Sequence, residues 1–129
     1  MVGHHLSRFL LQQGYRVLVL TRNSGSTERN GIGYRHWDPA TGTVAADAIA
    51  EADFIVHLAG AGVADKRWTR KRKIEIRESR TRGSETLVQA LRTIPNKVQA
   101  VVSASAIGWY GPDNGTAFTE EAPAATDFL

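Results

Sequence analysis

The sequence contains no cysteine and no long run of apolar residues. Without cysteine the chain has no disulfide framework and no thiolate metal site, which suits a reducing cytosol. No apolar segment approaches the roughly 20 residues that a membrane-spanning helix requires. The opening residues, MVGHH, lack both the cationic head and the continuous apolar core of a secretory signal peptide. We therefore expect a soluble, cytoplasmic protein that does not enter a membrane.

The 129 residues are 42% apolar and 22% charged, a balance that excludes a disordered chain and fits one globular domain. The charge is unevenly placed. Residues 66–82 hold nine of the sixteen Lys and Arg but only two acidic residues, so they carry +7 and the rest of the chain carries −4. Nucleic acid is the less favoured partner for this basic stretch, because only Trp68 offers a stacking ring and no reader motif occurs. A solvated helix face or a subunit contact is the favoured interpretation.

Apolar periodicity predicts an alternation of helices and strands. The predicted helices are 2–13, 45–52 and 69–94, and the predicted strands are 15–21, 34–37, 53–59 and 98–103. All the strands except 34–37 are nearly continuous in apolar residues, which is typical of parallel strands buried on both faces. Residues 23–33 and 105–123 are predicted to be loops. The order indicates an α/β fold with a doubly wound parallel sheet.

Three stretches of the chain resemble a single family. They are VHLAGAG at 56–62 followed by RWT at 67–69, ESR at 78–80 leading to TLV at 86–88, and VSASAIGWYG at 102–111 followed by Phe118, Glu120 and Asp127-Phe128. Together they resemble the atypical extended short-chain dehydrogenase/reductases, in particular the epimerase-like, NADP-binding subfamily related to NAD-dependent epimerases and dehydratases. The resemblance covers essentially the whole chain and implies a Rossmann-like sheet with NADP as cofactor.

The resemblance also implies that the sheet is incomplete. The family begins with a strand and a Gly-x-x-Gly-x-x-Gly turn, and Gly3 matches the third glycine, so the first strand and two glycines are absent. We expect residues 1–129 to be a partial NAD(P)-binding Rossmann domain, whose relatives continue far beyond Leu129. The absent strand would lie between the strands at 15–21 and 53–59. Either the remainder of the fold or a homo-oligomer partner would then be needed to complete the sheet.

Arg22 closes the strand at 15–21, where NAD-selective sheets carry an acidic residue for the ribose 2′-hydroxyl. A guanidinium matches a 2′-phosphate instead, which favours NADP over NAD, and Asn23 could add a neutral donor. Without the resemblance, Arg22 would be an ordinary exposed arginine at a strand end. For Asp38 the resemblance implies contact with the adenine amine, whereas the Asp38-Pro39 dipeptide by itself indicates only a turn. Both interpretations of Asp38 stay open.

Leu58, Ala59 and Gly60 end the strand at 53–59, beside the point where open α/β sheets bind ligands. Small residues at that point would let the cofactor ribose approach the backbone. The alternative is a strand-end turn that requires glycine. His57, within the same strand, is interpreted as a packed core histidine, and no metal-binding constellation is found in the sequence.

Ser103 and Ser105 end the strand at 98–103, where relatives carry the catalytic serine or threonine. The resemblance assigns catalysis to Ser105, whose hydroxyl would bond the substrate carbonyl or alcohol, and places Ser103 beside the cofactor. The alternative is that both hydroxyls cap the strand backbone. The usual Tyr-x-x-x-Lys partner is absent, because no tyrosine is followed by lysine four positions later. If the motif exists, it lies beyond Leu129.

The leading hypothesis is an NADP-dependent oxidoreductase or epimerase-like enzyme that acts on a small molecule, either a carbonyl or alcohol or a sugar-nucleotide-like substrate. The alternative is a non-catalytic NADP-binding or sensing module. The absent Tyr-x-x-x-Lys motif favours this alternative, and so does Arg80, which replaces the asparagine found in many extended relatives. A second hypothesis for Arg80 is that it binds a phosphate of the cofactor or substrate.

Overall fold

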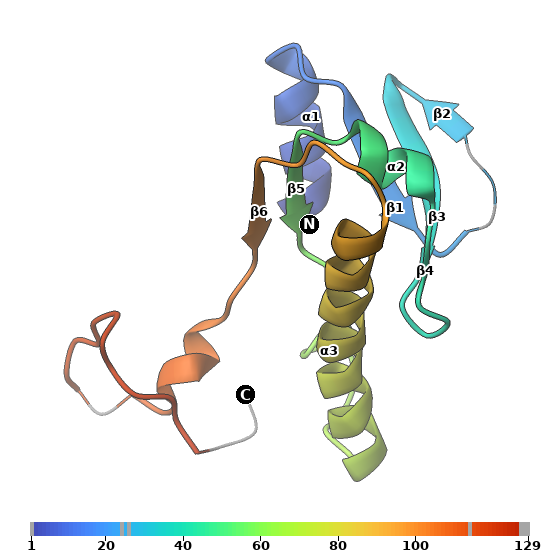
Figure 1. The fold of residues 1–129 in the computed structure, drawn as a ribbon. Coiled ribbons are helices and arrows are strands. Elements are labelled where there is room, and N and C mark those ends of the chain that lie inside the picture. The colour runs from blue at the N-terminus through green and yellow to red at the C-terminus, as the bar shows by residue number, and fades with distance from the viewer. Residues whose placement is uncertain (1, 24, 26, 114, 127–129) are drawn as a thin grey trace.

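The structure is a computed structural model that describes residues 2–23, 25, 27–113 and 115–126. In chain order its elements are α1 (Val2–Gln12), β1 (Val17–Thr21), β2 (Thr27–Arg29), β3 (Ile32–Asp38), β4 (Thr43–Val44), α2 (Ala46–Glu51), β5 (Phe54–His57), α3 (Arg70–Thr93), β6 (Ala100–Ser103) and the short 3-10 helix η1 (Ile107–Tyr110) (Figure 1). Every predicted helix and strand is confirmed, with ends that differ by a few residues.

The strands form two separate hydrogen-bonded groups. In the first, β1 runs parallel to β3, with Thr21 opposite His36, while β2 and β4 pair with β3 in the antiparallel sense. In the second, β5 runs parallel to β6, with His57 opposite Ser103. The two parallel pairs with helices between them confirm the α/β class. Among the described residues no hydrogen-bonded pairing joins β1 to β5, so each of these strands has one edge without a partner strand.

The predicted loop at 23–33 is wrong in its second half, which folds into the β2–β3 hairpin. The turn of this hairpin consists of Asn30 at φ 53° and Gly31 at φ 76°. Two consecutive residues with positive φ define the type I′ turn, and its twist matches that of the flanking strands. The Asn-Gly dipeptide is the strongest short-range signal for such a hairpin, so the sequence did contain this information. The predicted loop at 105–123 likewise contains η1.

Helix α3 organises the core. Its N-terminus is capped by Thr69, whose hydroxyl accepts a hydrogen bond from the Arg72 amide at 3.2 Å. Near its middle, a Cβ on Gly83 would lie 3.4 Å from Cε1 of His57 and 3.6 Å from the Trp37 ring. The absence of a side chain at Gly83 therefore brings β3 and β5 close to the helix. The C-terminal half contributes to the cluster formed by Ile49, Leu87, Ala90, Val44, Ile55, Leu91 and Ile94.

The prediction that the apolar strands are buried on both faces is wrong for the described chain. Of β1 only Val17 is buried, β5 alternates between exposed and half-buried residues, and β6 is exposed throughout. The physical reason is that α3 covers only the face of β5 that carries Ile55 and His57, and leaves β6 exposed. The other face leaves Phe54 at 58% and Val102 at 61% exposure.

Candidate functional site

The first part of the candidate site lies at the carboxyl ends of β1 and β3. Arg22 and Asn23 directly follow β1, and the parallel register brings them to the edge at which β3 ends in Asp38. The Asn23 amide donates to Oγ1 of Thr21 at 3.3 Å. Arg22 is exposed, and within the described ranges its guanidinium has neither a hydrogen bond nor an ion pair. An unpaired guanidinium beside an amide side chain is a donor set that fits a phosphate group.

Asp38 stabilises a turn. Its Oδ1 accepts a hydrogen bond from the Ala40 amide at 2.9 Å, and its backbone oxygen accepts one from the Thr41 hydroxyl at 3.3 Å. Its partner in the β3–β4 pairing is Thr43. These contacts account for Asp38 as a turn residue, and the adenine contact stays a prediction.

The second part of the site lies at the carboxyl ends of β5 and β6. The Ala104 amide donates to the His57 carbonyl at 3.0 Å, which extends the pairing of these strands. Residues 58–60 and 103–105 therefore leave the sheet at the same edge. Helix α1 reaches this edge too, because a Cβ on Gly3 would lie 3.7 Å from Cδ1 of Leu58. The structure thus brings three predicted site segments together, those of Gly3, Leu58 and Ser103.

Ser103 and Ser105 are both exposed. In the part of the chain that the structure describes, neither hydroxyl bonds a backbone group, so the interpretation of these serines as strand caps has no support there. Both serines lie at the edge where Leu58 and Ala59 are also exposed. This arrangement leaves hydroxyl groups available to a polar ligand.

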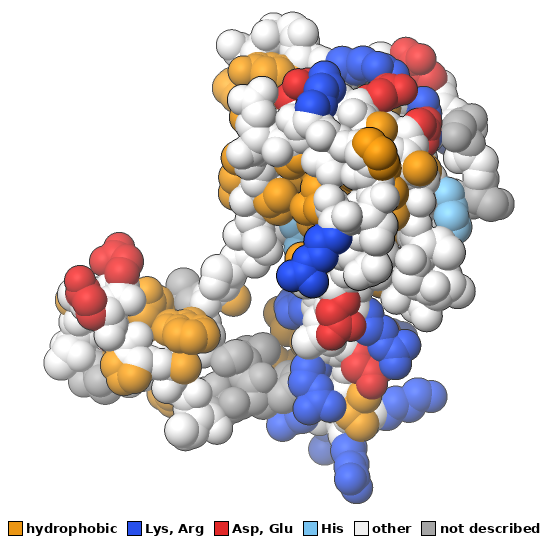
Figure 2. Space-filling view, viewed as in Figure 1, with side chains coloured by type: hydrophobic (Ala, Val, Ile, Leu, Met, Phe, Trp, Pro, Cys, Tyr) orange, Lys and Arg blue, Asp and Glu red, His pale blue; other side chains and the backbone are white. Residues whose placement is uncertain are grey.

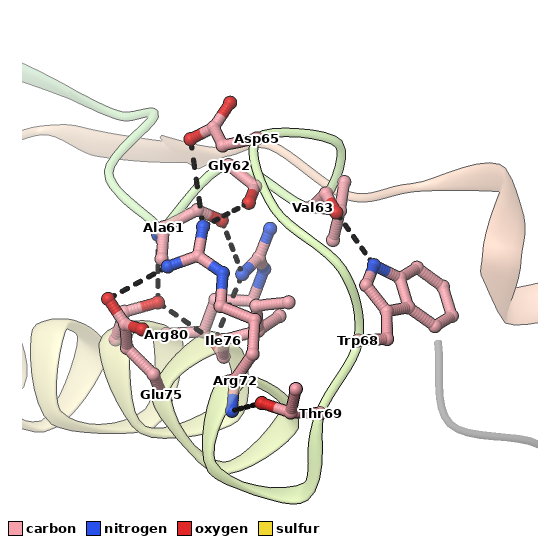
Figure 3. Close-up of polar contacts among 11 residues, drawn as sticks. Ala61, Gly62, Val63, Asp65, Trp68, Thr69, Arg72, Glu75, Ile76 and Arg80 are labelled. Atoms are coloured by element: carbon pink, nitrogen blue, oxygen red, sulfur yellow. Dashed lines mark hydrogen bonds and ion pairs between the residues drawn. The ribbon is translucent and has the colours of Figure 1, made fainter.

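The loop that follows β5 is attached to α3 by three side chains, of which the sequence identified only that of Arg80 as a functional candidate (Figure 3). The Ala61 amide donates to Oγ of Ser79 at 2.9 Å, and Nη1 of Arg80 donates to the Ala61 carbonyl at 3.2 Å. Arg72 donates through Nη2 to the Gly62 carbonyl. On the side to which a Cβ of Gly60 would point lies Arg80, since that Cβ would be 3.3 Å from Cζ of Arg80. The approach of a ribose to Gly60 stays a prediction.

Arg72 is a buried charge with anionic partners. Its relative exposure is 7%, and its guanidinium lies 2.8 Å from Oε1 of Glu75 and 3.6 Å from Oδ2 of Asp65. The hydrogen bond from Arg72 lowers the pKa of Glu75, and the nearby charges of Lys66 and Lys71 act in the same direction. Arg72 therefore belongs to the interior of the loop and not to a solvated helix face.

The outward cations form a separate group on α3. Figure 2 shows Lys and Arg side chains gathered around the N-terminal half of this helix. Arg70, Lys73 and Arg77 line, with Ile74, a surface groove of about 300 Å³. Nζ of Lys73 lies 5.8 Å from the centre of the Trp68 ring. The basic stretch is thus divided between residues that hold the loop and residues that face outward.

His57 is half-buried and packs against Trp37 and α3, in agreement with its interpretation as a packed histidine. Its ring meets the Trp37 ring edge-on, with centroids 5.9 Å apart and an interplanar angle of 75°. Burial lowers the pKa of His57, which favours the neutral imidazole. Across the described ranges, no three His, Asp or Glu side chains gather in a way that would hold a metal ion. No helix within these ranges has the length and apolarity needed to cross a bilayer.

The segment after β6 makes contacts of its own. The Tyr110 ring stacks on Phe118 with centroids 5.1 Å apart, and the Trp109 indole donates to the Ala122 carbonyl at 3.4 Å. The Ala125 amide donates to the Trp109 carbonyl at 2.8 Å. Figure 1 shows this segment apart from the sheets and α3.

Comparison with known sequences identifies relatives over the whole chain. Residues 1–128 match the family model described as the NAD dependent epimerase/dehydratase family. The chain is 32% identical over 129 residues to the epimerase family protein YfhF of Bacillus subtilis, covering 99% of this chain and 42% of that protein. It is 30% identical over 129 residues to the epimerase family protein ML0860 of Mycobacterium leprae, covering 100% of this chain and 40% of that protein. The chain thus spans about two fifths of the length of these relatives.

Among solved structures, the fold is similar to the crystal structure of the human epimerase family protein SDR39U1 (isoform 2) with NADPH. The TM-score is 0.75 at 23% sequence identity, and the match covers 99% of this chain and 41% of the human chain. This similarity supports the α/β fold with a Rossmann-like parallel sheet.

Proposed function

Because this chain belongs to the NAD dependent epimerase/dehydratase family, we propose that it forms the cofactor-binding part of an NADP-dependent oxidoreductase or epimerase-like enzyme. The observation that carries the proposal is the convergence of Gly3, Leu58 and Ser103 at the carboxyl edge of the β5–β6 pair. Ligands of open α/β sheets bind outside the carboxyl ends of the strands. The substrate would be a small molecule, either a carbonyl or alcohol or a sugar-nucleotide-like compound.

Arg22 supports NADP over NAD. Its exposed guanidinium has no carboxylate partner among the described residues and is available to a 2′-phosphate, with Asn23 beside it. The human relative was crystallised with NADPH, which agrees with this choice. Gly3 and the exposed residues Leu58 and Ala59 would contact the rest of the dinucleotide, with Ser103 nearby. When bound, the nicotinamide supplies or accepts a hydride.

Ser105 would position the substrate. Its exposed hydroxyl can donate to a carbonyl oxygen or accept from an alcohol, which orients the reacting carbon. The chain contains no Tyr-x-x-x-Lys motif, so the proposal assigns no acid–base pair to these residues. Turnover of a carbonyl or alcohol substrate by the protein from its complete gene would distinguish an enzyme from a non-catalytic NADP-binding module.

The cofactor choice is tested by Arg22→Ala in the protein expressed from its complete gene. We expect NADPH to bind roughly tenfold to a hundredfold more weakly, because a hydrogen bond to a charged group contributes about 1.5–3 kcal/mol. NADH affinity should stay unchanged, since NADH has no 2′-phosphate. Titrations followed by nicotinamide fluorescence measure both affinities.

Arg29→Ala is the matched control for Arg22→Ala, because Arg29 is an exposed arginine of the same sheet, on β2, which β3 separates from β1. It removes the same charge at the other end of the sheet, away from the carboxyl ends of β1 and β3, and should leave both affinities unchanged. An equal loss for NADPH and NADH in Arg22→Ala, or no loss, would contradict the assignment of Arg22.

A further inference from the structure

The loop after β5 is held to α3 by a closed set of hydrogen bonds. Both polar groups of residue 61 are used, because the Ala61 amide donates to the Ser79 hydroxyl and the Ala61 carbonyl accepts from Arg80. The Ser79 hydroxyl in turn donates to the Ile76 carbonyl at 2.8 Å. Its proton and its acceptor lone pair are therefore both committed. The loop backbone has a defined position relative to the helix.

The orientation of Arg80 is determined by backbone carbonyls. Its Nη1 donates to Ile76 at 3.0 Å as well as to Ala61, and its guanidinium lies over Gly60. Ile76 is buried, with 3% of its surface exposed. Arg80 thus joins a buried turn of α3 to the loop that leaves β5.

We propose that Ser79 and Arg80 are positioning residues that hold the backbone of residues 58–60 in the conformation that receives the dinucleotide. This inference rests on the proposed function, because it concerns the same cofactor site. Arg72 adds a third attachment one peptide further on, through the Gly62 carbonyl. All three side chains belong to α3, so a shift of this helix would move the loop with it.

This role differs from binding a phosphate. Residues 58–60 would face the part of the dinucleotide that NADP and NAD share, since Arg22 lies at the end of β1 and these residues at the end of β5. A displaced loop is therefore expected to weaken the binding of both nucleotides by the same factor. If Arg80 instead bound the 2′-phosphate, its substitution would weaken the binding of NADP only, because NAD has a hydroxyl in that place.

The test compares Ser79→Ala and Arg80→Gln with the wild type, in the protein expressed from its complete gene. We expect the Ala61 amide to exchange with solvent faster in both variants, because each removes one of its attachments to α3. NADPH and NADH should each bind roughly twofold to tenfold more weakly, with their ratio unchanged, because the loop is displaced while no hydrogen bond to the nucleotide itself is removed. Arg80→Lys retains a donor and should recover most of the affinity.

Ser84→Ala and Arg77→Gln are the controls, since both residues are exposed on α3 and neither bonds the loop. They should change neither exchange nor affinity. Unchanged exchange at Ala61 in Ser79→Ala, or a loss confined to NADPH in Arg80→Gln, overturns the inference. If Arg80→Gln does not fold, Ser79→Ala still decides. If the wild type binds neither nucleotide, the proposed function fails, and the exchange measurement shows independently whether α3 holds the loop.

Discussion

At the scale of single residues, burial lowers the pKa of His57. The imidazole lies between the Trp37 ring and Gly83, and its desolvation lowers the pKa below the ordinary value. The unfolded chain, with a His pKa near 6.5, then binds the proton more readily than the folded protein. The contribution of neutral His57 to stability is therefore present above about pH 6.5 and is lost as the pH falls below it.

We predict that the melting temperature falls between pH 7.5 and 5.5, and that His57→Gln removes part of this dependence. The physical reason is that glutamine does not titrate, so that folding no longer competes with protonation at this position. Thermal unfolding at several pH values measures the effect. His4→Gln, on the exposed side of α1, is the control and should keep the wild-type slope. Identical slopes in wild type and His57→Gln would contradict the assignment.

Site residues could be predicted from the sequence where the signal lies in neighbouring residues, and not where it depends on distant ones. Arg22 and Ser103 are found at strand ends, which the apolar pattern locates. Ser79 and Arg72 were missed because their partners, Ala61 and Gly62, lie 18 and 10 residues away. Helix periodicity places these side chains on a face, but it does not specify what that face touches. For the same reason the sequence allowed a phosphate-binding role for Arg80, whereas in the structure its guanidinium bonds the loop.

At the scale of elements, Gly83 shows how close contact and helix propensity oppose each other. Glycine inside a helix costs roughly 0.5–1 kcal/mol relative to alanine. A Cβ at this position would meet His57 at 3.4 Å and Trp37 at 3.6 Å, distances near ordinary van der Waals contact. The site thus has room for one methyl group and no more.

We predict that Gly83→Ala raises the free energy of unfolding by about 0.5–1 kcal/mol, because the helix gains propensity without a clash. Gly83→Leu should lower it by about 1–3 kcal/mol, since the larger side chain must displace His57 or Trp37. Urea unfolding of the protein from its complete gene measures both changes. A destabilised Gly83→Ala would mean that the helix and β5 approach more closely than these distances indicate.

Helices and strands could be predicted where neighbouring residues determine their ends. The start of α3 was predicted to within one residue, and it is fixed locally, because the Thr69 cap needs only the amides of the next turn. The polar composition of residues 23–33 predicted a loop, yet Asn30-Gly31 turns the chain into the β2–β3 hairpin. The burial of strands was wrong for a different reason. An apolar run indicates that a strand tends to be buried, but its actual burial depends on which neighbouring elements cover it. Among the described residues, β6 stays exposed.

At the scale of the whole molecule, the described residues enclose a small core and leave large apolar surfaces open. Eight apolar residues are buried among them, two of which are alanines. On α1, by contrast, Val2, Leu6 and Phe9 line, with His5, an open apolar hollow of about 610 Å³. The β5–β6 pair has only two strands, and two strands alone are marginally stable in water. The apolar surface available for burial therefore exceeds what these residues bury among themselves.

We predict that residues 1–129 in isolation do not unfold cooperatively as a monomer. The free edges of β1 and β5 and the open faces of α1 and β6 offer too little burial to offset chain entropy, which normally leaves only about 5–15 kcal/mol of net stability. Urea and thermal unfolding, with the mass measured by light scattering, test this. The protein from its complete gene is the comparison and should melt in one transition. A sharp, concentration-independent transition of a monomeric 129-residue chain would show instead that the contacts of α3 with β3, β5 and the loop at 60–62 suffice to fold it.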